Sequence, residues 1–170
     1  STSYKINTSS RKKSKMATVQ DINSIFREKG LTLGSVESFT GGLFAREITA
    51  VPGASKFYKG ALVTYATEEK VRLLGICQED VDKYGVVSNE IAYQMAKFGK
   101  EKLNVDICVS FTGNAGPDAM EGKPVGEIYI GLATKEKVEA YRYQLEGNRN
   151  KIQEDAISLA LALLEKNIKK

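Results

Sequence analysis

The sequence predicts a single α/β domain in which helices cover both faces of a mixed β-sheet. From residue 18 onward, segments with helical spacing of apolar residues alternate with short extended runs, and joints with Gly or Pro separate them. At 170 residues the chain is long enough to bury one core without disulfides or a metal. We therefore expect a three-layer α/β/α sandwich over residues 18–170, with no second domain.

The positive charge of the chain is concentrated at its start. The first 16 residues carry five cationic side chains and no acid, so taking five from the formal charge of +4 leaves −1 on the other 154 residues. We expect residues 1–17 to form a basic, flexible N-terminal tail; a nuclear address and the remnant of an organelle transit peptide stay open as alternatives. The rest of the chain lacks the clustered basic charge of a nucleic-acid groove, so nucleic acid is not an expected partner.

Two residue types limit the chemistry. The chain has no histidine, and Cys77 and Cys108 are isolated thiols. A Ser-His-Asp triad, a Cys-His dyad and a histidine-ligated metal are thereby excluded, and we expect no metal or other cofactor. Reduced cysteines favour a cytoplasmic location, and the run "ISLALALL" is too short to span a bilayer, so no membrane partner is expected.

The first half of the chain predicts a helix, a strand, a second helix and a second strand. Thr18 and Asp21 have the spacing of a capping box, and Gly30 lies where a C-terminal cap belongs, so the first helix is expected between them. The elements that follow are a strand at 31–38, a helix that begins at Thr40 or just after it, a loop at 51–57 and a strand at 58–66.

The second half continues the alternation. Thr67 is expected to cap a short helix that ends at Gly75. The later elements are a helix from Ser88 to Asn104, a strand at 105–111, a loop rich in Gly and Pro at 112–126, paired strands at 127–134 and 138–145, and a last helix from about Asn148.

Ser38 lies at the joint between the first strand and the second helix. Its hydroxyl would project at the carboxyl edge of the strand, beside the N–H groups of Thr40, Gly41 and Gly42. Unpaired amides at the start of a helix hold an oxyanion or a phosphate. Because the spacing of a nucleophile elbow is absent, a serine near a helix cap, with glycines for close packing, is the alternative interpretation.

Lys70 and Tyr65 are candidates to act with Ser38. Lys70 falls in the first turn of the helix capped by Thr67, where the helix dipole disfavours a cation and lowers the pKa of an amine. In a chain without histidine, such a lysine is a candidate base for a serine. Tyr65, at the end of the preceding strand, is expected in the same cleft. The alternatives are a solvated lysine and a tyrosine that packs at the strand edge.

The second glycine-rich loop is expected to face the first. Loops at the carboxyl ends of strands line the ligand crevice of an open α/β sheet, which would place Thr112, Gly113 and Gly116 opposite Ser38. Arg149, near the start of the last helix, is a candidate phosphate clamp, and a solvated arginine is its alternative.

Six motifs in order, "ESFTGG", "VTYATEEK", "GVVSNE", "SFTGNAGP", "KPVG" and "GNRN", resemble the C-terminal domain of the competence/damage-inducible CinA family over about residues 18–166. That family hydrolyses the carboxamide of nicotinamide mononucleotide to nicotinic acid mononucleotide and ammonia. The resemblance implies that Ser38 is the nucleophile, that Tyr65 and Lys70 activate it, and that Thr112 holds the substrate. We also expect a homodimer.

Five positions depart from the family pattern, two of which, Ala119 and Met120, lie in a stretch that is usually rich in glycine. Phe39 replaces the usual cysteine beside Ser38, Asn114 replaces an aliphatic residue, and Gln153 lies where a second arginine is common. A ring is bulkier than a thiol and would reshape the pocket. These departures leave open an alternative function, a binding module for a nucleotide or a protein partner.

Overall fold

The structure is a computed structural model that describes residues 3–6 and 16–169. In these residues the strands are β1 (Ser3–Ile6), β2 (Leu33–Glu37), β3 (Tyr58–Val63), β4 (Ile107–Gly113), β5 (Glu127–Ala133) and β6 (Val138–Gln144). The helices are α1 (Val19–Lys29), α2 (Leu43–Thr49), α3 (Thr67–Arg72), α4 (Gln78–Tyr84), α5 (Asn89–Leu103) and α6 (Arg149–Ile168), and a 3₁₀ turn, η1, spans Ala54–Lys56.

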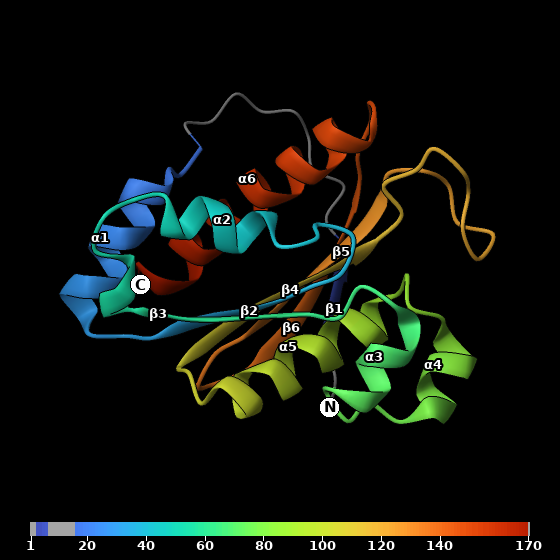
Figure 1. Cartoon of the computed structure of the whole chain (residues 1–170), viewed down its shortest axis with the longest axis horizontal. Helices are drawn as coiled ribbons and strands as arrows, with labels where there is room; N and C mark the ends of the chain where they lie inside the picture. Colours follow the sequence, from blue (N-terminus) through green and yellow to red (C-terminus); the bar gives the residue numbers. More distant parts are fainter. Residues whose placement is uncertain (1–2, 7–15, 170) are drawn as a thin grey trace.

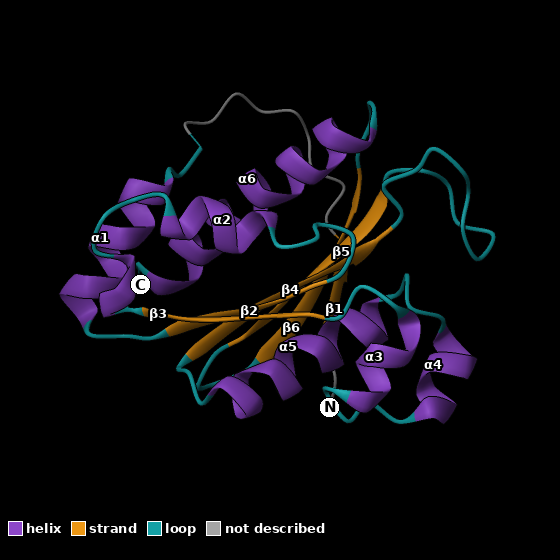
Figure 2. Ribbon diagram, in the orientation of Figure 1, coloured by secondary structure: helices purple, strands orange, loops and turns teal. Residues whose placement is uncertain are grey.

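The strands form one mixed sheet in the order β1-β6-β5-β4-β2-β3. β2 pairs in parallel with both β3 and β4, whereas β5 pairs antiparallel with both β4 and β6. Figure 1 shows α1, α2 and α6 on one face of this sheet and α3, α4 and α5 on the other. The expected three-layer α/β/α architecture is therefore confirmed, and its layers are plain in Figure 2.

Each face of the sheet carries its own apolar core. Phe26, Phe44 and Phe111 belong to the cluster beneath α1, α2 and α6. Ile91 and Met95 of α5 belong to the cluster on the opposite face. The central strands contribute to both clusters because successive side chains of a strand point to opposite faces, which explains why β4 is buried almost throughout.

The helix caps follow the sequence. Thr18 accepts a hydrogen bond from the N–H of Asp21 and completes the capping box, and Gly30 ends α1 in the left-handed conformation. Ser88 and Asn148 cap α5 and α6 through their side chains. These predictions succeed because each cap joins residues no more than four positions apart.

Two helices on the α5 face differ from the expectation. Thr67 is the first residue of α3 rather than its cap, since the extended backbone of Ala66 already precedes the helix. Helix α4 was not predicted. It has only seven residues and buries only Val81, so it shows no apolar stripe.

The N-terminal segment also contains an element that the sequence did not indicate. Ser3–Ile6 pairs in parallel with β6, so the expectation of a flexible tail over residues 1–17 is corrected at these four positions. A strand here covers the edge of β6, which would otherwise expose unpaired backbone groups. Residues 1–2 and 7–15 lie outside the described part, and the division between tail and domain stays a prediction.

Candidate functional site

The carboxyl ends of β2, β3 and β4 meet at one edge of the sheet and place three hydroxyl groups in a row. Glu37 is in register with Val63 of β3 and Phe111 of β4. The pairing continues one residue further, because the N–H of Ser38 donates to the carbonyl of Phe111 at 3.0 Å and the N–H of Thr64 donates to that of Glu37 at 2.9 Å. Thr64, Ser38 and Thr112 are therefore neighbours across the three strands, on the face covered by α3 and α5.

Lys70 reaches this row from α3. Its Nζ donates to Ser38 Oγ at 2.9 Å and to the carbonyl of Thr64 at 2.6 Å. Only 1% of Lys70 is exposed, and Ser38 is also buried. The structure thus brings together the predicted nucleophile and the predicted base, and the alternative of a solvated lysine does not describe Lys70.

Burial changes the protonation of Lys70. Desolvation lowers the pKa of its amine from 10.5 to about 8, and the charges of Glu121 and Glu68 oppose this shift. The helix dipole was the expected cause of a lowered pKa, whereas burial is the largest cause in the structure. A substantial fraction of Lys70 is therefore neutral just above neutral pH and can accept a proton from Ser38.

The Tyr65 phenol is not brought to Ser38. The backbone carbonyl of Tyr65 accepts a 3.5 Å hydrogen bond from Ser38 Oγ, but 59% of the residue is exposed and its hydroxyl accepts a hydrogen bond from Arg149 Nη2 at 2.9 Å. Thr64, one residue earlier, occupies the position beside Ser38. The Tyr65 phenol, which was expected in the same cleft as Ser38 and Lys70, is instead bonded to Arg149.

Glu37 occupies the Gly42 amide, one of the three that were expected to be free for a ligand. Its carboxylate accepts hydrogen bonds from the Thr40 hydroxyl at 2.7 Å and from the N–H groups of Gly42, Phe44 and Ala45 at 3.0–3.1 Å. The fully buried carboxylate thus caps α2 from inside the protein.

This cap corrects the expected role of Gly42, whose N–H donates to Glu37, whereas Thr40 contributes only its hydroxyl to the cap. The N–H of Gly41 also has an internal partner, the carbonyl of Ser38 at 3.0 Å. In the described part of the chain, the N–H groups of Phe39 and Thr40 have no hydrogen-bond acceptor. These two amides, directly after Ser38, are therefore unpaired donors in that part of the chain.

The second glycine-rich loop has mainly a structural role at the predicted positions. The Thr112 hydroxyl donates to the carbonyl of Val86 at 2.6 Å and is 1% exposed. A Cβ on Gly113 would lie 2.6–2.8 Å from atoms of Ile128, so glycine allows β4 and β5 to approach closely. The Thr112 hydroxyl is therefore not free for a substrate, which corrects its expected role, and the expected substrate contact of Gly113 stays a prediction.

Arg149 ties three segments together at the same edge of the sheet. Its Nη1 donates to the carbonyl of Gly116 at 2.5 Å, and its Nη2 donates to the Tyr65 hydroxyl. Tyr65 follows β3, Gly116 follows β4, and Arg149 is the first residue of α6. The arginine is exposed, and its expected role as a phosphate clamp stays a prediction.

Three of the departures from the family pattern, at Phe39, Asn114 and Gln153, are accommodated inside the fold. Phe39 is 4% exposed and packs into the core beneath α1, α2 and α6, so its ring does not reshape a pocket as expected. Gln153 donates to the carbonyl of Phe39 at 2.8 Å. Asn114 builds the turn after β4 by accepting from the N–H of Gly116 at 3.0 Å and donating to the carbonyl of Lys123.

Sequence reasoning missed two carboxylates. Glu37 stands three residues before Thr40, which is the only sequence signal that it binds the start of α2. Glu121, in the loop between β4 and β5, accepts hydrogen bonds at 3.0 Å from the N–H groups of Val86 and Val87 and raises the pKa of Lys70 by its charge. No local pattern marks it, since its partners lie 34 and 35 residues away.

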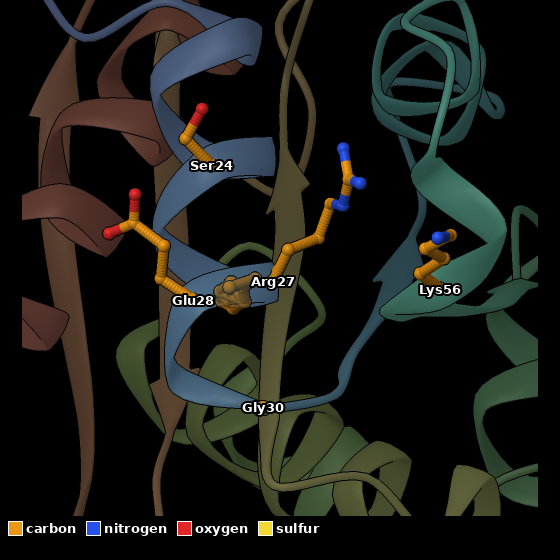
Figure 3. A pocket seen from close by; sticks show the side chains of 6 residues that line it. Ser24, Arg27, Glu28, Gly30 and Lys56 are labelled. Carbon is orange, nitrogen blue, oxygen red and sulfur yellow. The ribbon is translucent and has the colours of Figure 1, made fainter.

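A hollow of about 490 Å³ lies elsewhere, at the C-terminal half of α1. In Figure 3, Arg27 extends from α1 toward the segment that carries Lys56, and Gly30 closes the lower end. This region adjoins the amino end of β2, whereas Ser38 follows its carboxyl end. The hollow is therefore separate from the Ser38 site.

Two absences apply to the described residues alone. Among residues 3–6 and 16–169, no group of three or more His, Cys, Asp or Glu side chains is arranged to hold a metal ion. None of the helices in that part combines the length and the apolar composition that a membrane crossing requires.

Comparison with known proteins identifies the family. Residues 15–168 match the family model described as the CinA C-terminal domain. The chain belongs to the CinA C-terminal domain family. It is 44% identical over 142 residues to a competence-damage inducible protein of Caldicellulosiruptor saccharolyticus, covering 83% of this chain and 34% of that protein. The corresponding protein of Bacillus subtilis is 39% identical over 151 residues, covering 86% of this chain and 36% of that protein.

Solved CinA structures share the fold. The competence/damage inducible protein CihA of Agrobacterium tumefaciens superposes with a TM-score of 0.85 at 28% identity, covering 89% of this chain and 93% of that one. A CinA superfamily protein of Enterobacter cloacae gives a TM-score of 0.86 at 26% identity, covering 95% and 99%. The chain spans about a third of the length of the two sequence relatives.

Proposed function

We propose that this CinA domain hydrolyses the carboxamide of nicotinamide mononucleotide to nicotinic acid mononucleotide and ammonia. The observation that carries the proposal is the buried contact of 2.9 Å between Lys70 Nζ and Ser38 Oγ, in which burial lowers the pKa of the amine to about 8. A hydroxyl paired with such an amine suits nucleophilic attack on an amide. The expected homodimer and cytoplasmic location belong to the same proposal.

The first half of the reaction forms an ester on Ser38. Neutral Lys70 takes the hydroxyl proton, and Ser38 Oγ attacks the carboxamide carbon. The N–H groups of Phe39 and Thr40 hold the oxyanion that forms. The Lys70 ammonium then gives its proton to the departing nitrogen, the C–N bond breaks, and ammonia leaves.

In the second half, water hydrolyses the ester. Lys70, neutral again, removes a proton from the attacking water, and the returned proton restores the hydroxyl of Ser38 as nicotinic acid mononucleotide departs. Tyr65 has a different place from the one that the resemblance implies. With its hydroxyl on Arg149, it orients the guanidinium toward the phosphate of the nucleotide instead of activating Ser38.

The test is ammonia release from nicotinamide mononucleotide by the purified protein between pH 6 and 10. Ser38→Ala should lower kcat by more than about a thousandfold because the nucleophile is lost. Lys70→Met should lower kcat far more than it raises KM. Ser55→Ala, at an exposed position, serves as the control and should behave like the wild type.

Two outcomes would count against the proposal. A folded wild-type protein that releases no ammonia across this pH range would rule it out, and if calorimetry then showed nucleotide binding, the binding-module alternative would take its place. An Ser38→Ala protein with wild-type turnover would rule out Ser38 as the nucleophile.

A further inference from the structure

The hydroxyl of Thr64 is a buried polar group that the proposed mechanism does not use. The residue is fully buried, and Oγ1 has no hydrogen-bond partner in the described part of the chain. Folded proteins rarely leave such a group unpaired, because it loses its hydration without gaining a partner. An unpaired hydroxyl beside a candidate nucleophile therefore points to a partner that it gains at another stage of the reaction.

The backbone holds Thr64 firmly against Ser38 and Lys70. Its N–H donates to the carbonyl of Glu37 at 2.9 Å, which extends the pairing of β2 and β3. Its carbonyl accepts the 2.6 Å hydrogen bond from Lys70 Nζ. The Thr64 side chain lies next to that of Ser38 in the row of hydroxyl groups, on the face from which Lys70 approaches.

When the amine of Lys70 is protonated, it has more N–H donors than the hydrogen-bond acceptors that it contacts in the structure. An ammonium group has three N–H donors. Ser38 Oγ and the carbonyl of Thr64 accept two of them. Since Lys70 is 1% exposed, water is a poor partner for the third, and Thr64 Oγ1 is the unpaired acceptor on a residue that already holds Nζ.

We propose that Thr64 is a positioning residue whose hydroxyl accepts the third hydrogen bond of the Lys70 ammonium. The ammonium forms when the proton of Ser38 Oγ passes to Lys70 Nζ, and the bond is released when that proton passes to the departing nitrogen. The kinetic consequence rests on the proposed function, whereas the consequence for the protonation of Lys70 does not. The hydroxyl favours the charged form, so its removal lowers the pKa of Lys70.

Other groups also act on Lys70 and stay in place in the test. Glu121 from the loop between β4 and β5 and Glu68 on α3 raise the pKa of Lys70, while burial lowers it. Thr64→Val removes a hydroxyl but no charge and keeps the β-branched shape. Both carboxylates are retained, so a change in the pKa of Lys70 reports the loss of the hydrogen bond.

The direct experiment is an NMR titration of protein with ¹³Cε- and ¹⁵Nζ-labelled lysine, in which the signal missing from Lys70→Met assigns Lys70. In Thr64→Val the pKa of Lys70 should fall by about one unit, as expected for a lost hydrogen bond to a charged group. Thr64→Ser should keep the wild-type pKa. On the alkaline plateau of nicotinamide mononucleotide hydrolysis, kcat of Thr64→Val should be about tenfold lower with KM unchanged.

Thr112→Val is the matched control, because its hydroxyl lies on the other side of Ser38 and bonds Val86 instead of Lys70. It should lower stability in urea and leave the pKa of Lys70 unchanged. Thr64→Val should keep or raise stability, since it removes an unpaired buried hydroxyl. If Thr64→Val fails to fold, Thr64→Ala is used in its place, and the pKa of Lys70 should fall by the same amount.

An unchanged pKa of Lys70 in Thr64→Val would overturn the inference, and so would an equal fall in Thr64→Ser, since packing and not the hydroxyl would then be responsible. If wild-type protein releases no ammonia but the pKa of Lys70 falls in Thr64→Val alone, the proposed function fails and the inference about Thr64 stands.

Discussion

At the residue scale, the protonation of Lys70 controls the state of Ser38. In the structure the amine donates to Ser38 Oγ and to the carbonyl of Thr64, and the serine proton is directed at the carbonyl of Tyr65. When the amine is neutral, its lone pair can accept that proton instead. Because burial lowers the pKa of Lys70 to about 8, the change between the two states falls within the pH range in which enzymes work.

Lys70→Met should stabilise the protein at neutral pH. The pKa of Lys70 is about 8 in the folded state and 10.5 in its ordinary state, so the unfolded chain binds more protons between these values. Below pH 8, Lys70 therefore lowers the free energy of unfolding of the wild type by about 3 kcal/mol, and this loss disappears as the pH rises to 10.5. Lost hydrogen bonds to Ser38 and Thr64 offset part of the gain.

At pH 7, urea unfolding should give Lys70→Met a free energy of unfolding about 1–2 kcal/mol higher than that of the wild type. This difference in free energy should narrow between pH 8 and 10.5. Lys102→Met, at an exposed position on α5, should show no such narrowing. A difference that is constant with pH would mean that Lys70 titrates as an ordinary lysine.

At the scale of elements, the junction of β2 and α2 depends on Glu37. Helix α2 has seven residues, and its N-cap residue, Gly42, has no side chain to cap it. Glu37, the last residue of β2, supplies the missing cap and fixes the turn that carries Ser38. The negative charge at this helix end also makes it a poor place for a substrate phosphate.

Glu37→Gln should lower the free energy of unfolding by about 2–3 kcal/mol, because the amide NH₂ would face N–H donors that now meet a carboxylate oxygen. Urea unfolding at pH 7 measures this change, and Glu47→Gln, at an exposed position on the same helix, is the control. Equal stability of the two variants would show that the cap contributes little.

At the scale of the whole molecule, the order of the sheet assembles the site. Ser38, Thr64 and Gly116 follow the adjacent strands β2, β3 and β4. Arg149, at the start of α6, donates a hydrogen bond to the carbonyl of Gly116. These segments are more than 20 residues apart in sequence, so only the folded sheet brings them together. Arg149 bonds two of these segments at once, those that carry Tyr65 and Gly116.

Arg149→Ala should raise KM for nicotinamide mononucleotide by about tenfold to a hundredfold through the loss of a charge-assisted contact to phosphate. The same substitution should have a much smaller effect on KM for nicotinamide riboside, because that substrate has no phosphate. Lys151→Ala removes an exposed cation from the same helical turn and should leave both values near those of the wild type. An equal increase in KM for the two substrates would show that Arg149 organises the loops and does not bind phosphate.

The sequence determined the features that depend on near neighbours. Caps at Thr18, Gly30 and Ser88 and the alternation of helices and strands could be predicted because each arises from residues a few positions apart. The order of short motifs also indicated Ser38 and Lys70, which the fold brings into contact.

Tertiary structure decided the partners of those side chains. It assigned Glu37 to the amides of α2, Thr112 to Val86 and the Tyr65 hydroxyl to Arg149, and it placed Ser3–Ile6 beside β6. Each of these contacts either crosses between elements or depends on the angle at which a strand meets a helix. A polar group bonds the nearest suitable partner in space, and strand order, which the local sequence does not encode, fixes which partner that is.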